Sequence, residues 1–475
     1  MACDTKYQRF QCIQLCDEER DFMVKAPISG EQTEKASLYN WPTSSRPAPV
    51  SRKVRRKRRR VNSYPLTPIT LELTGFESGG RAVGRADDGR VVFVEFGIPG
   101  ERVVAEITDE YPNYIEATAV MVIDPSSDRI TARCEYFGRC GGCQLQHIEY
   151  DRQLDLKTEV VCDALRRVAR LEQSVIDECV RDMWGMDDPW EYRNHMRFTV
   201  RRSGDVGQMQ RGTHRFFRID ECKIALPDVN EILTLAQERT KNTHQLAVRI
   251  GQATGDRLIQ PELQWRPGRR SGRPNSGQEY YNEVLSVPVS ESIDSTGKIE
   301  GKYRVSGPAF FQVNTSQAER LAGLVIERTL EINPKTVIDA YSGVGTFSVL
   351  LAPLVDEMIA IEESKGANSD ARFNLQANQN VKRVTAKVED ALEELETAPD
   401  VIIIDPPRAG ILPSVTDAII QSQVSRVIYV SCDPQTLARD LKIFVEAGFR
   451  INQIQPIDMF PQTQHIECVT TLTRG

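Results

Sequence analysis

Residues 426–434 read RVIYVSCDP, an apolar, β-branched run that ends in a cysteine followed by Asp-Pro. The run at 427–430 predicts a strand buried on both faces, and Asp433 and Pro434 end it. In open α/β sheets, ligands bind at the carboxyl ends of the strands. A free cysteine more often packs as a small hydrophobe, but the polar neighbours of Cys432 favour a reactive thiol at this edge. Cys432 is therefore the candidate nucleophile.

Length and composition describe a multidomain chain. Its 475 residues leave room for about three domains. The sequence has no apolar run of about 18 residues, which excludes a transmembrane helix, and its acidic amino terminus is unlike a transit peptide. We therefore expect a cytoplasmic monomer without a membrane partner, whose eleven cysteines serve as thiols, metal ligands or catalysts rather than disulfides. The net charge of −7 does not predict a nucleic-acid binder, although the basic residues are clustered.

The first two segments differ in pattern. Residues 1–64 carry the run RKVRRKRRR at 52–60 and no sustained periodicity, which predicts a disordered basic tail that either binds RNA phosphates or is merely solvated. Residues 65–125 contain five short alternating stretches, with a hairpin signal at Asp87-Asp88-Gly89. This pattern predicts a small closed β-barrel of the OB type. Such barrels are RNA binders or plain adaptors, and Arg81, Arg85 and Arg90 favour RNA contact.

A third segment, residues 126–305, begins with a cysteine motif. Cys134, Cys140 and Cys143 lie on a glycine-rich loop that can fold tightly around one metal centre. Cys162 and Cys179 fit better as packed residues of a helix predicted over 146–170 and at its end, so Cys222 is preferred as the fourth ligand. Zinc and an iron–sulfur cluster both accept four thiolates, and unrelated buried thiols are the remaining alternative.

The same segment is locally basic. Arginines dominate the interval 193–218, with aromatic side chains between them. Guanidinium groups bind phosphate and aromatic rings stack on unpaired bases, so we expect an RNA surface; a solvated strand edge is the alternative. Residues 266–277 are rich in Gly, Pro and Ser and predict a mobile loop. The arginines are Arg193, Arg197, Arg201, Arg202, Arg211, Arg215 and Arg218.

Residues 306–475 alternate between strand and helix patterns, which predicts an α/β domain. A helix is expected to start near Thr315 and Ser316. The glycine-rich turn in DAYSGVGTFS, at 339–348, lets the backbone approach a ligand closely. Glu362 follows the next strand and is placed to bind ribose hydroxyls, while Asp390, after a strand predicted over 384–388, is placed to bind an adenine amino group. Because GxGxxG is absent, the pattern favours S-adenosylmethionine over NAD.

Six motifs together resemble the RNA uracil-C5 methyltransferase family, most closely its 23S ribosomal RNA members. They are CEYFGRCGGCQLQH, FFQVN, DAYSGVGTFS, DPPRAG, SCDPQTLARD and FPQTQHIE. The resemblance covers residues 65–475 and implies a TRAM barrel, a central α+β iron–sulfur domain and a class I (Rossmann-like) S-adenosylmethionine-dependent methyltransferase domain. It implies Cys432 as the nucleophile and Glu467 as the base. The implied [4Fe-4S] ligands are Cys134, Cys140, Cys143 and Cys222, and the implied methyl-donor contacts are Gln312, Tyr341, Thr346, Glu362, Asp390 and Asp405.

The residue chemistry agrees with this resemblance. Uracil C5 is too electron-poor to attack a sulfonium methyl group, so a thiolate must first add to C6. A carboxylate must then remove the C5 proton, and Glu467 is suited to that step. The target base must leave its stack, with Phe310 or Phe311 supporting it. Cys468, beside the predicted base, is expected only to pack.

Three other functions compete with this interpretation. An N6-adenine methyltransferase needs an aromatic residue after its Pro-Pro motif, where this chain has Arg408. A transfer RNA uridine is the alternative substrate for the same chemistry. A non-catalytic RNA-binding factor is the alternative from another class, and intact nucleophile, base and donor motifs count against it.

Overall fold

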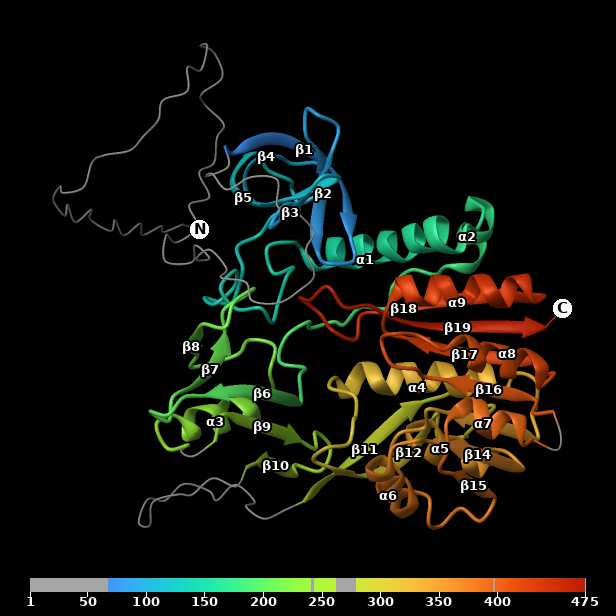
Figure 1. Ribbon diagram of the computed structural model, residues 1–475. Coiled ribbons are helices and arrows are strands. Elements are labelled where there is room, and N and C mark those ends of the chain that lie inside the picture. Colours follow the sequence, from blue (N-terminus) through green and yellow to red (C-terminus); the bar gives the residue numbers. More distant parts are fainter. Residues whose placement is uncertain (1–66, 241–242, 262–278, 396–397, 475) are drawn as a thin grey trace, which may run out of the picture.

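The computed structural model describes residues 67–240, 243–261, 279–395 and 398–474. The chain runs from a small β-barrel, through an antiparallel sheet, to a larger α/β part that holds the C-terminus (Figure 1). The predicted tail at 1–64 and the loop predicted at 266–277 lie outside the described residues. None of the described helices combines the length and hydropathy that a membrane crossing requires.

Five strands close into a barrel in the order β1-β2-β3-β5-β4, which confirms the predicted small closed barrel. Alternate residues such as Leu71, Leu73, Val92 and Val94 point inward and are buried, because successive side chains of a strand face opposite sides. The predicted hairpin joins β2 to β3. The strands are β1 (Ile69–Glu77), β2 (Arg81–Arg85), β3 (Val91–Glu95), β4 (Arg102–Glu110) and β5 (Tyr114–Asp124).

A helical connector joins the barrel to the α/β part. α1 (Tyr150–Ala164) contacts β1 at one end, continues as the π-helical turn η2 (Leu165–Ala169) and is followed by α2 (Gln173–Cys179). The helix begins later than the predicted residue 146, because the side chain of Glu149 caps it by accepting a hydrogen bond from Tyr150 N. α1 and η2 also pack on α9 (Pro434–Glu446).

The central part is a five-stranded antiparallel sheet in the order β10-β9-β6-β7-β8. Its apolar side packs on α3 (Pro227–Ala236) through residues such as Phe198, Leu233 and Val248. The strands are β6 (His195–Val200), β7 (Val206–Met209), β8 (Phe216–Arg218), β9 (Gln245–Ile250) and β10 (Arg257–Gln260).

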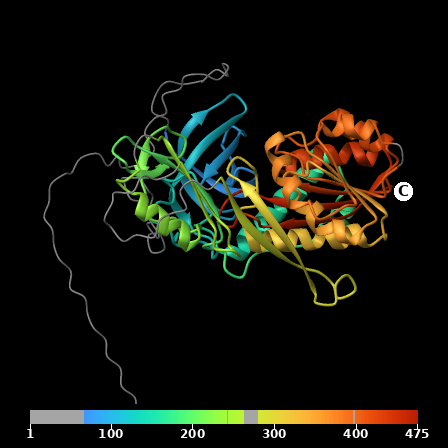
Figure 2. The ribbon, with the colours of Figure 1, turned by 90° about the horizontal axis from the view of Figure 1, so that it is seen from below.

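A two-stranded ribbon links this sheet to the α/β part. β11 (Tyr280–Pro288) pairs with β12 (Lys298–Ser306), and Figure 2 shows the ribbon between the central sheet on one side and the α/β part on the other. α4 (Thr315–Leu330) follows and packs against β11. The predicted start near Thr315 and Ser316 is confirmed, and the N-cap is Asn314, whose side chain accepts a hydrogen bond from Gln317 N.

The α/β part contains a seven-stranded sheet in the order β15-β14-β13-β16-β17-β19-β18. Neighbouring strands from β15 to β17 are parallel, and β19 pairs antiparallel with both β17 and β18. This arrangement agrees with the predicted Rossmann-like fold. The strands are β13 (Thr336–Ala340), β14 (Glu357–Ile361), β15 (Val381–Val384), β16 (Val401–Ile404), β17 (Arg426–Ser431), β18 (Phe449–Ile457) and β19 (Glu467–Arg474).

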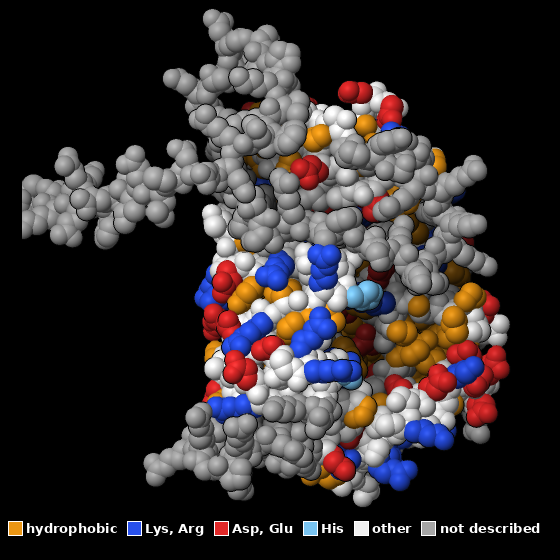
Figure 3. Space-filling view, turned by 60° about the vertical axis from the view of Figure 1, so that its left-hand side comes forward, with side chains coloured by type: hydrophobic (Ala, Val, Ile, Leu, Met, Phe, Trp, Pro, Cys, Tyr) orange, Lys and Arg blue, Asp and Glu red, His pale blue; other side chains and the backbone are white. Residues whose placement is uncertain are grey.

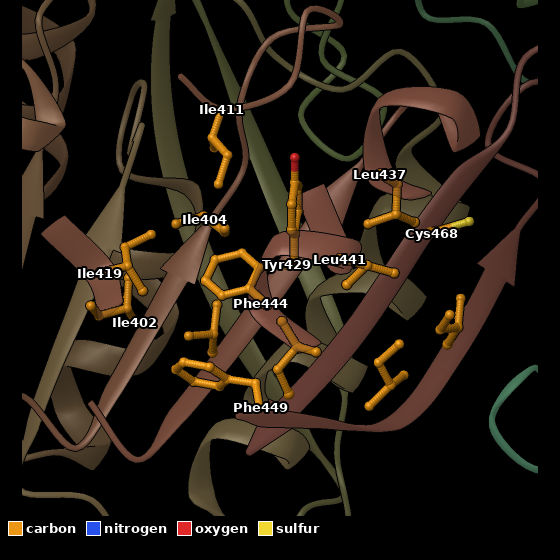
Figure 4. Close-up of a cluster of buried hydrophobic side chains, with 14 of the residues drawn as sticks. Ile402, Ile404, Ile411, Ile419, Tyr429, Leu437, Leu441, Phe444, Phe449 and Cys468 are labelled. Carbon is orange, nitrogen blue, oxygen red and sulfur yellow. The ribbon is translucent and has the colours of Figure 1, made fainter. Parts of the chain in front are cut away.

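Both faces of this sheet are covered. Ile402, Ile404 and Tyr429 face a core that contains Leu441 and Phe444 of α9 (Figure 4), whereas Ile403, Ile428 and Val430 face α4 and the ribbon. This double burial explains why β16 and β17 are continuous apolar runs. The remaining helices are α5 (Thr346–Leu351), the 3-10 turn η3 (Ala352–Leu354), α6 (Lys365–Asn374), α7 (Val388–Glu393) and α8 (Pro413–Gln421).

Candidate active site

Cys432 lies between the end of β17 and the start of α9, and its side chain is partly exposed. Every residue of β17 is buried, which fixes the strand in the sheet. Asp433 caps α9 through its carboxylate, which accepts hydrogen bonds from Gln435 N at 3.0 Å and Thr436 N at 2.9 Å. Ser431 Oγ accepts from Asp433 N at 3.3 Å. The thiol is thus held by a buried strand on one side and a capped helix on the other.

The register of the sheet brings Glu467 to this thiol. β17 and β19 are antiparallel and pair Ser431 with Cys468, so the next residues along, Cys432 and Glu467, stand opposite each other. Glu467 is 4% exposed. Cys468 is 1% exposed and packs in the core on the side of α9, as expected (Figure 4).

Three acidic groups interact electrostatically here. Burial and the nearby carboxylates of Glu467 and Asp405 raise the pKa of Cys432 to about 12, while Arg408 acts in the opposite direction. Burial, followed by Asp405, raises the pKa of Glu467 well above its usual value. Burial and Asp339 raise the pKa of Asp405 to about 7. The Cys432 thiol is therefore protonated at neutral pH, and Asp405 is close to half protonated there.

Arg408 and His465 form a polar contact that the sequence analysis did not assign to the site. Arg408 is exposed, and its Nη2 lies 3.0 Å from His465 Nδ1. Burial and the charge of Arg408 lower the pKa of His465 to about 4, so the imidazole is neutral at pH 7. Both residues belong to quoted motifs, DPPRAG and FPQTQHIE, but their proximity depends on tertiary structure.

A pocket opens at the carboxyl ends of β13 and β16. Tyr341 begins the glycine turn with a left-handed backbone (φ 65°), and Gly343 (φ 56°) and Gly345 (φ 88°) continue it. A non-glycine residue in this region is uncommon and is often found at functional sites. The pocket is lined by Phe310, Phe311, Gln312, Ala318, Leu321, Tyr341, Ser342, Gly343, Val344, Thr346, Phe347 and Asp405.

Four of the six predicted donor contacts line this pocket: Gln312, Tyr341, Thr346 and Asp405. Glu362 supports its floor, because its carboxylate accepts hydrogen bonds from Gly343 N at 3.0 Å and Ser364 N at 2.6 Å. Asp339, buried beneath the turn, accepts from Ser348, and its Oδ1 has no hydrogen-bond partner among the described residues. Two carboxylates thus fix the turn and the helix after it, Glu362 at Gly343 and Asp339 at Ser348.

Asp390 is the exception. The strand predicted over 384–388 was wrong, because β15 ends at Val384 and α7 begins at Val388. Asp390 lies in the first turn of α7 with an exposed side chain, and it is not among the residues that line the pocket. Its neighbour Glu389 is the residue that acts electrostatically on Tyr341.

The two phenylalanines of FFQVN have different environments. Phe310 is 69% exposed at the pocket, whereas Phe311 is 3% exposed and contacts Tyr303. Only Phe310 is accessible to a base from outside the protein.

The four predicted metal ligands lie in one neighbourhood. Burial raises the pKa of Cys222 to about 11, with smaller contributions from Cys140 and Cys134. Burial also raises the pKa of Cys143, and the three other cysteines each raise it further. Within the described ranges, no group of three or more His, Cys, Asp or Glu side chains is arranged to hold a metal ion. Cys162 and Cys179 lie elsewhere and pack in the core below α9, as expected.

The predicted RNA arginines divide into two groups. Arg81 pairs with Glu77 and Glu116, and Arg90 pairs with Asp88 and Glu110, so these two barrel arginines are largely neutralised. Arg85 is exposed and donates a hydrogen bond to Gly89 O at 3.0 Å. In the central sheet, Arg211 pairs with Glu95 of the barrel and Arg218 with three acids. Four others are exposed and have no ion pair within the described part of the chain: Arg197, Arg201, Arg202 and Arg215. Figure 3 shows Lys and Arg side chains gathered on one face, beside a hollow flanked by hydrophobic side chains.

Comparison with protein families gives two matches. A family model described as tRNA (Uracil-5-)-methyltransferase matches residues 279–475, and the TRAM domain model matches residues 64–120. The second match covers most of the closed barrel, and the first begins at the ribbon and includes the whole seven-stranded sheet.

Two relatives align with most of this chain and over most of their own length. An uncharacterized RNA methyltransferase of Thermosynechococcus vestitus is 32% identical over 443 residues, covering 85% of this chain and 98% of the relative. One of Streptomyces coelicolor is 34% identical over 427 residues, covering 85% and 92%. The solved structure of Pyrococcus abyssi tRNA (uracil-54, C5)-methyltransferase in complex with S-adenosyl-L-homocysteine shares the fold, with a TM-score of 0.64, 22% identity, and coverage of 85% of this chain and 100% of that one.

Proposed function

This chain belongs to the RNA (uracil-5-)-methyltransferase family, and from that premise we propose that it transfers the methyl group of S-adenosyl-L-methionine to C5 of a uridine in 23S ribosomal RNA. The observation that carries the proposal is the juxtaposition of Cys432 and Glu467 across β17 and β19, at the sheet edge where the glycine-turn pocket opens. The first residue is suited to act as nucleophile and the second as base.

The pocket fits a nucleoside-type methyl donor. In this proposal Gln312, Tyr341, Thr346 and Asp405 contact the donor from the pocket wall, and Glu362 binds ribose hydroxyls while holding the glycine turn. Asp390 would reach an adenine group only from the rim, since its side chain is exposed. The bound donor supplies the methyl group on its sulfonium.

Cys432 activates the base. Its thiol gives its proton to a nearby acceptor, for which the carboxylate of Asp405 is suited, and the thiolate adds to uracil C6. The electron pair of the C5–C6 double bond becomes available at C5 as an enolate, which takes the methyl group while the electron pair of the broken carbon–sulfur bond stays on the donor's sulfur. The raised pKa of Cys432, about 12, keeps the thiol protonated in the resting enzyme. Arg408 favours the thiolate by its positive charge, so it supports addition once RNA has displaced water from the site.

Glu467 completes the reaction. Its carboxylate takes the C5 proton, the C–H electron pair forms the new C5–C6 double bond, and the C6–S bond breaks to release Cys432. Burial raises the pKa of Glu467, which makes the ionised carboxylate a stronger base than a solvated one. Phe310 offers an exposed ring beside the pocket on which the extruded uracil stacks.

We further propose that Cys134, Cys140, Cys143 and Cys222 hold a [4Fe-4S] cluster. The donor set fits, because the four thiols come from two loops of one neighbourhood and each influences another electrostatically. Four thiolates are the donor set that such a cluster would take, and they are also a set that a zinc ion accepts. Methyl transfer to an activated uracil requires no electron, so the cluster's role is in folding and RNA positioning.

Ribosomal RNA is preferred because the cysteine, nucleophile and base motifs resemble the 23S ribosomal RNA members of the family. A transfer RNA uridine is the second candidate, and two observations favour it: the matching family model is named for transfer RNA, and the Pyrococcus abyssi enzyme of similar fold is named for uracil 54 of transfer RNA. In both cases the exposed arginines Arg197, Arg201, Arg202 and Arg215 are suited to bind the RNA backbone.

The experiment that tests this function is a map of 5-methyluridine in ribosomal and transfer RNA from a strain that lacks the gene. One 23S site should lose the modification and regain it with the wild-type gene but not with Cys432→Ala. Loss of 5-methyluridine in transfer RNA alone would show that the substrate is the second candidate, a transfer RNA uridine. Complete 5-methyluridine in both RNAs would contradict the proposal.

A further inference from the structure

The loop that leads into Glu467 is held almost entirely by residues from outside its own sheet. It spans residues 458–466, between β18 and β19. Asp458 and Met459 are 0% exposed, and Gln462 and Thr463 are 2% exposed, so the loop is buried although it has no regular structure. Buried irregular backbone needs partners for its polar groups, and the origin of these partners identifies what fixes the base.

One set of partners comes from α1. Lys157 Nζ lies 2.6 Å from Asp458 Oδ1, and both side chains are fully buried. Tyr150 donates its hydroxyl to Asp458 Oδ2 at 2.9 Å, and Gln153 Nε2 donates to Gln462 Oε1 at 3.1 Å. These contacts join residues about three hundred positions apart in sequence, so the catalytic loop depends on a helix that precedes its domain.

The second set comes from the end of the cysteine loop. Gln462 has a left-handed backbone (φ 68°), and its carbonyl accepts hydrogen bonds from Gln144 N and Leu145 N, both at 3.1 Å. The side chain of Gln144 reaches further, since its Oε1 accepts from Gln464 N at 3.2 Å. Gln144 is adjacent to Cys143 in the sequence and donates its Nε2 to Gly141 O at 3.0 Å. One residue thus connects the cysteine loop to the loop that carries the base.

The barrel meets the same point. Gly80, in the turn between β1 and β2, has a left-handed backbone (φ 75°). A Cβ atom at this position would lie 3.1 Å from the Cβ atoms of both Gln144 and Gln464. The tip of the barrel therefore packs directly on the Gln144–Gln464 contact, and this close approach explains why the turn has glycine there.

We propose that Gln144 is a positioning residue for Glu467: the junction of Gly80, Gln144, Gln462 and Gln464 aligns the base from the barrel and the cysteine loop. The inference rests on the proposed function, because it assumes that Glu467 removes the C5 proton. It adds that the β-barrel and the cysteine loop control proton removal by Glu467, in addition to any role they have in binding RNA. Gln144 itself need not touch RNA or donor.

The chemistry provides a specific readout. If the base is misaligned, addition of Cys432 and methyl transfer still occur, but the C5 proton stays and the C6–S bond cannot break. The enzyme then remains covalently bonded to methylated RNA. A merely destabilised protein, by contrast, loses covalent adduct and product together.

The test compares Gln144→Ala with two matched variants under single-turnover and steady-state conditions. Gln144→Glu keeps an oxygen that accepts from Gln464 N but puts a negatively charged oxygen in place of the Nε2 donor to Gly141 O. Gln453→Ala removes a glutamine of β18 whose Oε1 accepts from Arg328 Nη2, away from the loop. Gln144→Ala should lower kcat about fivefold, the effect of losing the hydrogen bond to Gln464 N, with KM unchanged and with more SDS-resistant protein–RNA adduct. Gln453→Ala should behave as wild type, and Gln144→Glu should form no more adduct than wild type.

Gly80→Ala tests the same junction from the barrel side and should also increase the adduct, even if Gln144→Ala folds poorly. Wild-type kcat in both Gln144→Ala and Gly80→Ala, or lower kcat without extra adduct in either, would overturn the proposal. An inactive wild-type enzyme, or one that forms no adduct through Cys432, would instead overturn the proposed function, so the two failures are distinguishable.

Discussion

The sheet edge around Cys432 and the two loops that carry the four predicted cluster cysteines are built in different ways. At the sheet edge, Cys432, Glu467 and Asp405 each follow or begin a buried strand, and strand pairing alone sets their order. The two loops have little regular structure and are held by single hydrogen bonds, such as Cys134 N to Gln146 Oε1 at 3.0 Å and Cys222 N to Asn230 Oδ1 at 2.9 Å. A catalytic site on strand ends takes its order from the sheet, although the loop before Glu467 is also held from outside it, whereas a site on loops depends on its ligand or its neighbours throughout.

The largest effect should come from Glu467. Glu467→Gln keeps the size of the side chain but removes the base, so we expect turnover to fall about a thousandfold while the protein–RNA adduct accumulates. Denaturing gels with labelled RNA measure the adduct. If this variant turned over at the wild-type rate, the sheet edge would not be the catalytic region.

The cysteine region should respond through stability. Cys222→Ala should lose bound iron and sulfide after anaerobic purification and lower the free energy of unfolding by about 4 kcal/mol, because a lost metal centre is among the most damaging changes. Cys162→Ala is the control and should retain the metal, because it alters a partly exposed thiol that packs against the core below α9. Zinc without sulfide in the wild-type protein would reject the cluster.

Neighbouring phenylalanines sharpen the contrast between binding and packing. Phe310→Ala should raise KM for RNA about tenfold, since an exposed ring that stacks on a base contributes about 1–3 kcal/mol, and should leave the melting temperature unchanged. Phe311→Ala should instead destabilise the fold by about 3–5 kcal/mol, because its ring is buried against Tyr303. Equal effects on KM from both variants would argue against stacking at Phe310.

The smallest effect concerns the ionisation of the thiol. Arg408 opposes the raised pKa of Cys432, so Arg408→Met should raise that pKa further and slow alkylation of Cys432 by iodoacetamide at pH 8 about threefold. In the wild type, alkylation should accelerate steadily with rising pH, because the thiolate fraction grows towards a pKa of about 12. Methylation should decline as the pH falls, since Glu467 must be ionised to act and burial raises its pKa above the usual range of a carboxylate. Faster alkylation of Arg408→Met would contradict this electrostatic account.

The difference between strand ends and loops also explains which parts of the site could be predicted from the sequence. Cys432 and Asp405 were predictable because buried apolar runs mark strands and parallel strands place their carboxyl ends at one edge. Glu467 begins an antiparallel strand, and it was implied by the family resemblance instead. Asp390 was assigned to the end of a strand, but β15 is only Val381–Val384, and a short exposed strand has no strong periodic signal. Local patterns therefore locate the catalytic edge better than its outer rim.

Contacts between distant segments were not predictable in this way. The proximity of Arg408 to His465, and of Gln144 to Gln464, depends on the packing of loops that no local pattern encodes. The ion pairs that neutralise Arg81 and Arg90 also arise from partners on other strands or across a turn. The sequence therefore indicated basic clusters, and only the structure separates the exposed arginines from the paired ones.

The most direct measurement of the central claim uses RNA in which the target uridine is replaced by 5-fluorouridine. Fluorine at C5 cannot be removed as a proton, so a thiolate that adds to C6 and a methyl group that reaches C5 remain trapped. We predict that mass spectrometry of the digested complex finds methylated nucleotide bonded to Cys432, and that Cys432→Ala forms no adduct. An adduct on another residue, or methylation without any covalent bond to the protein, would contradict the account.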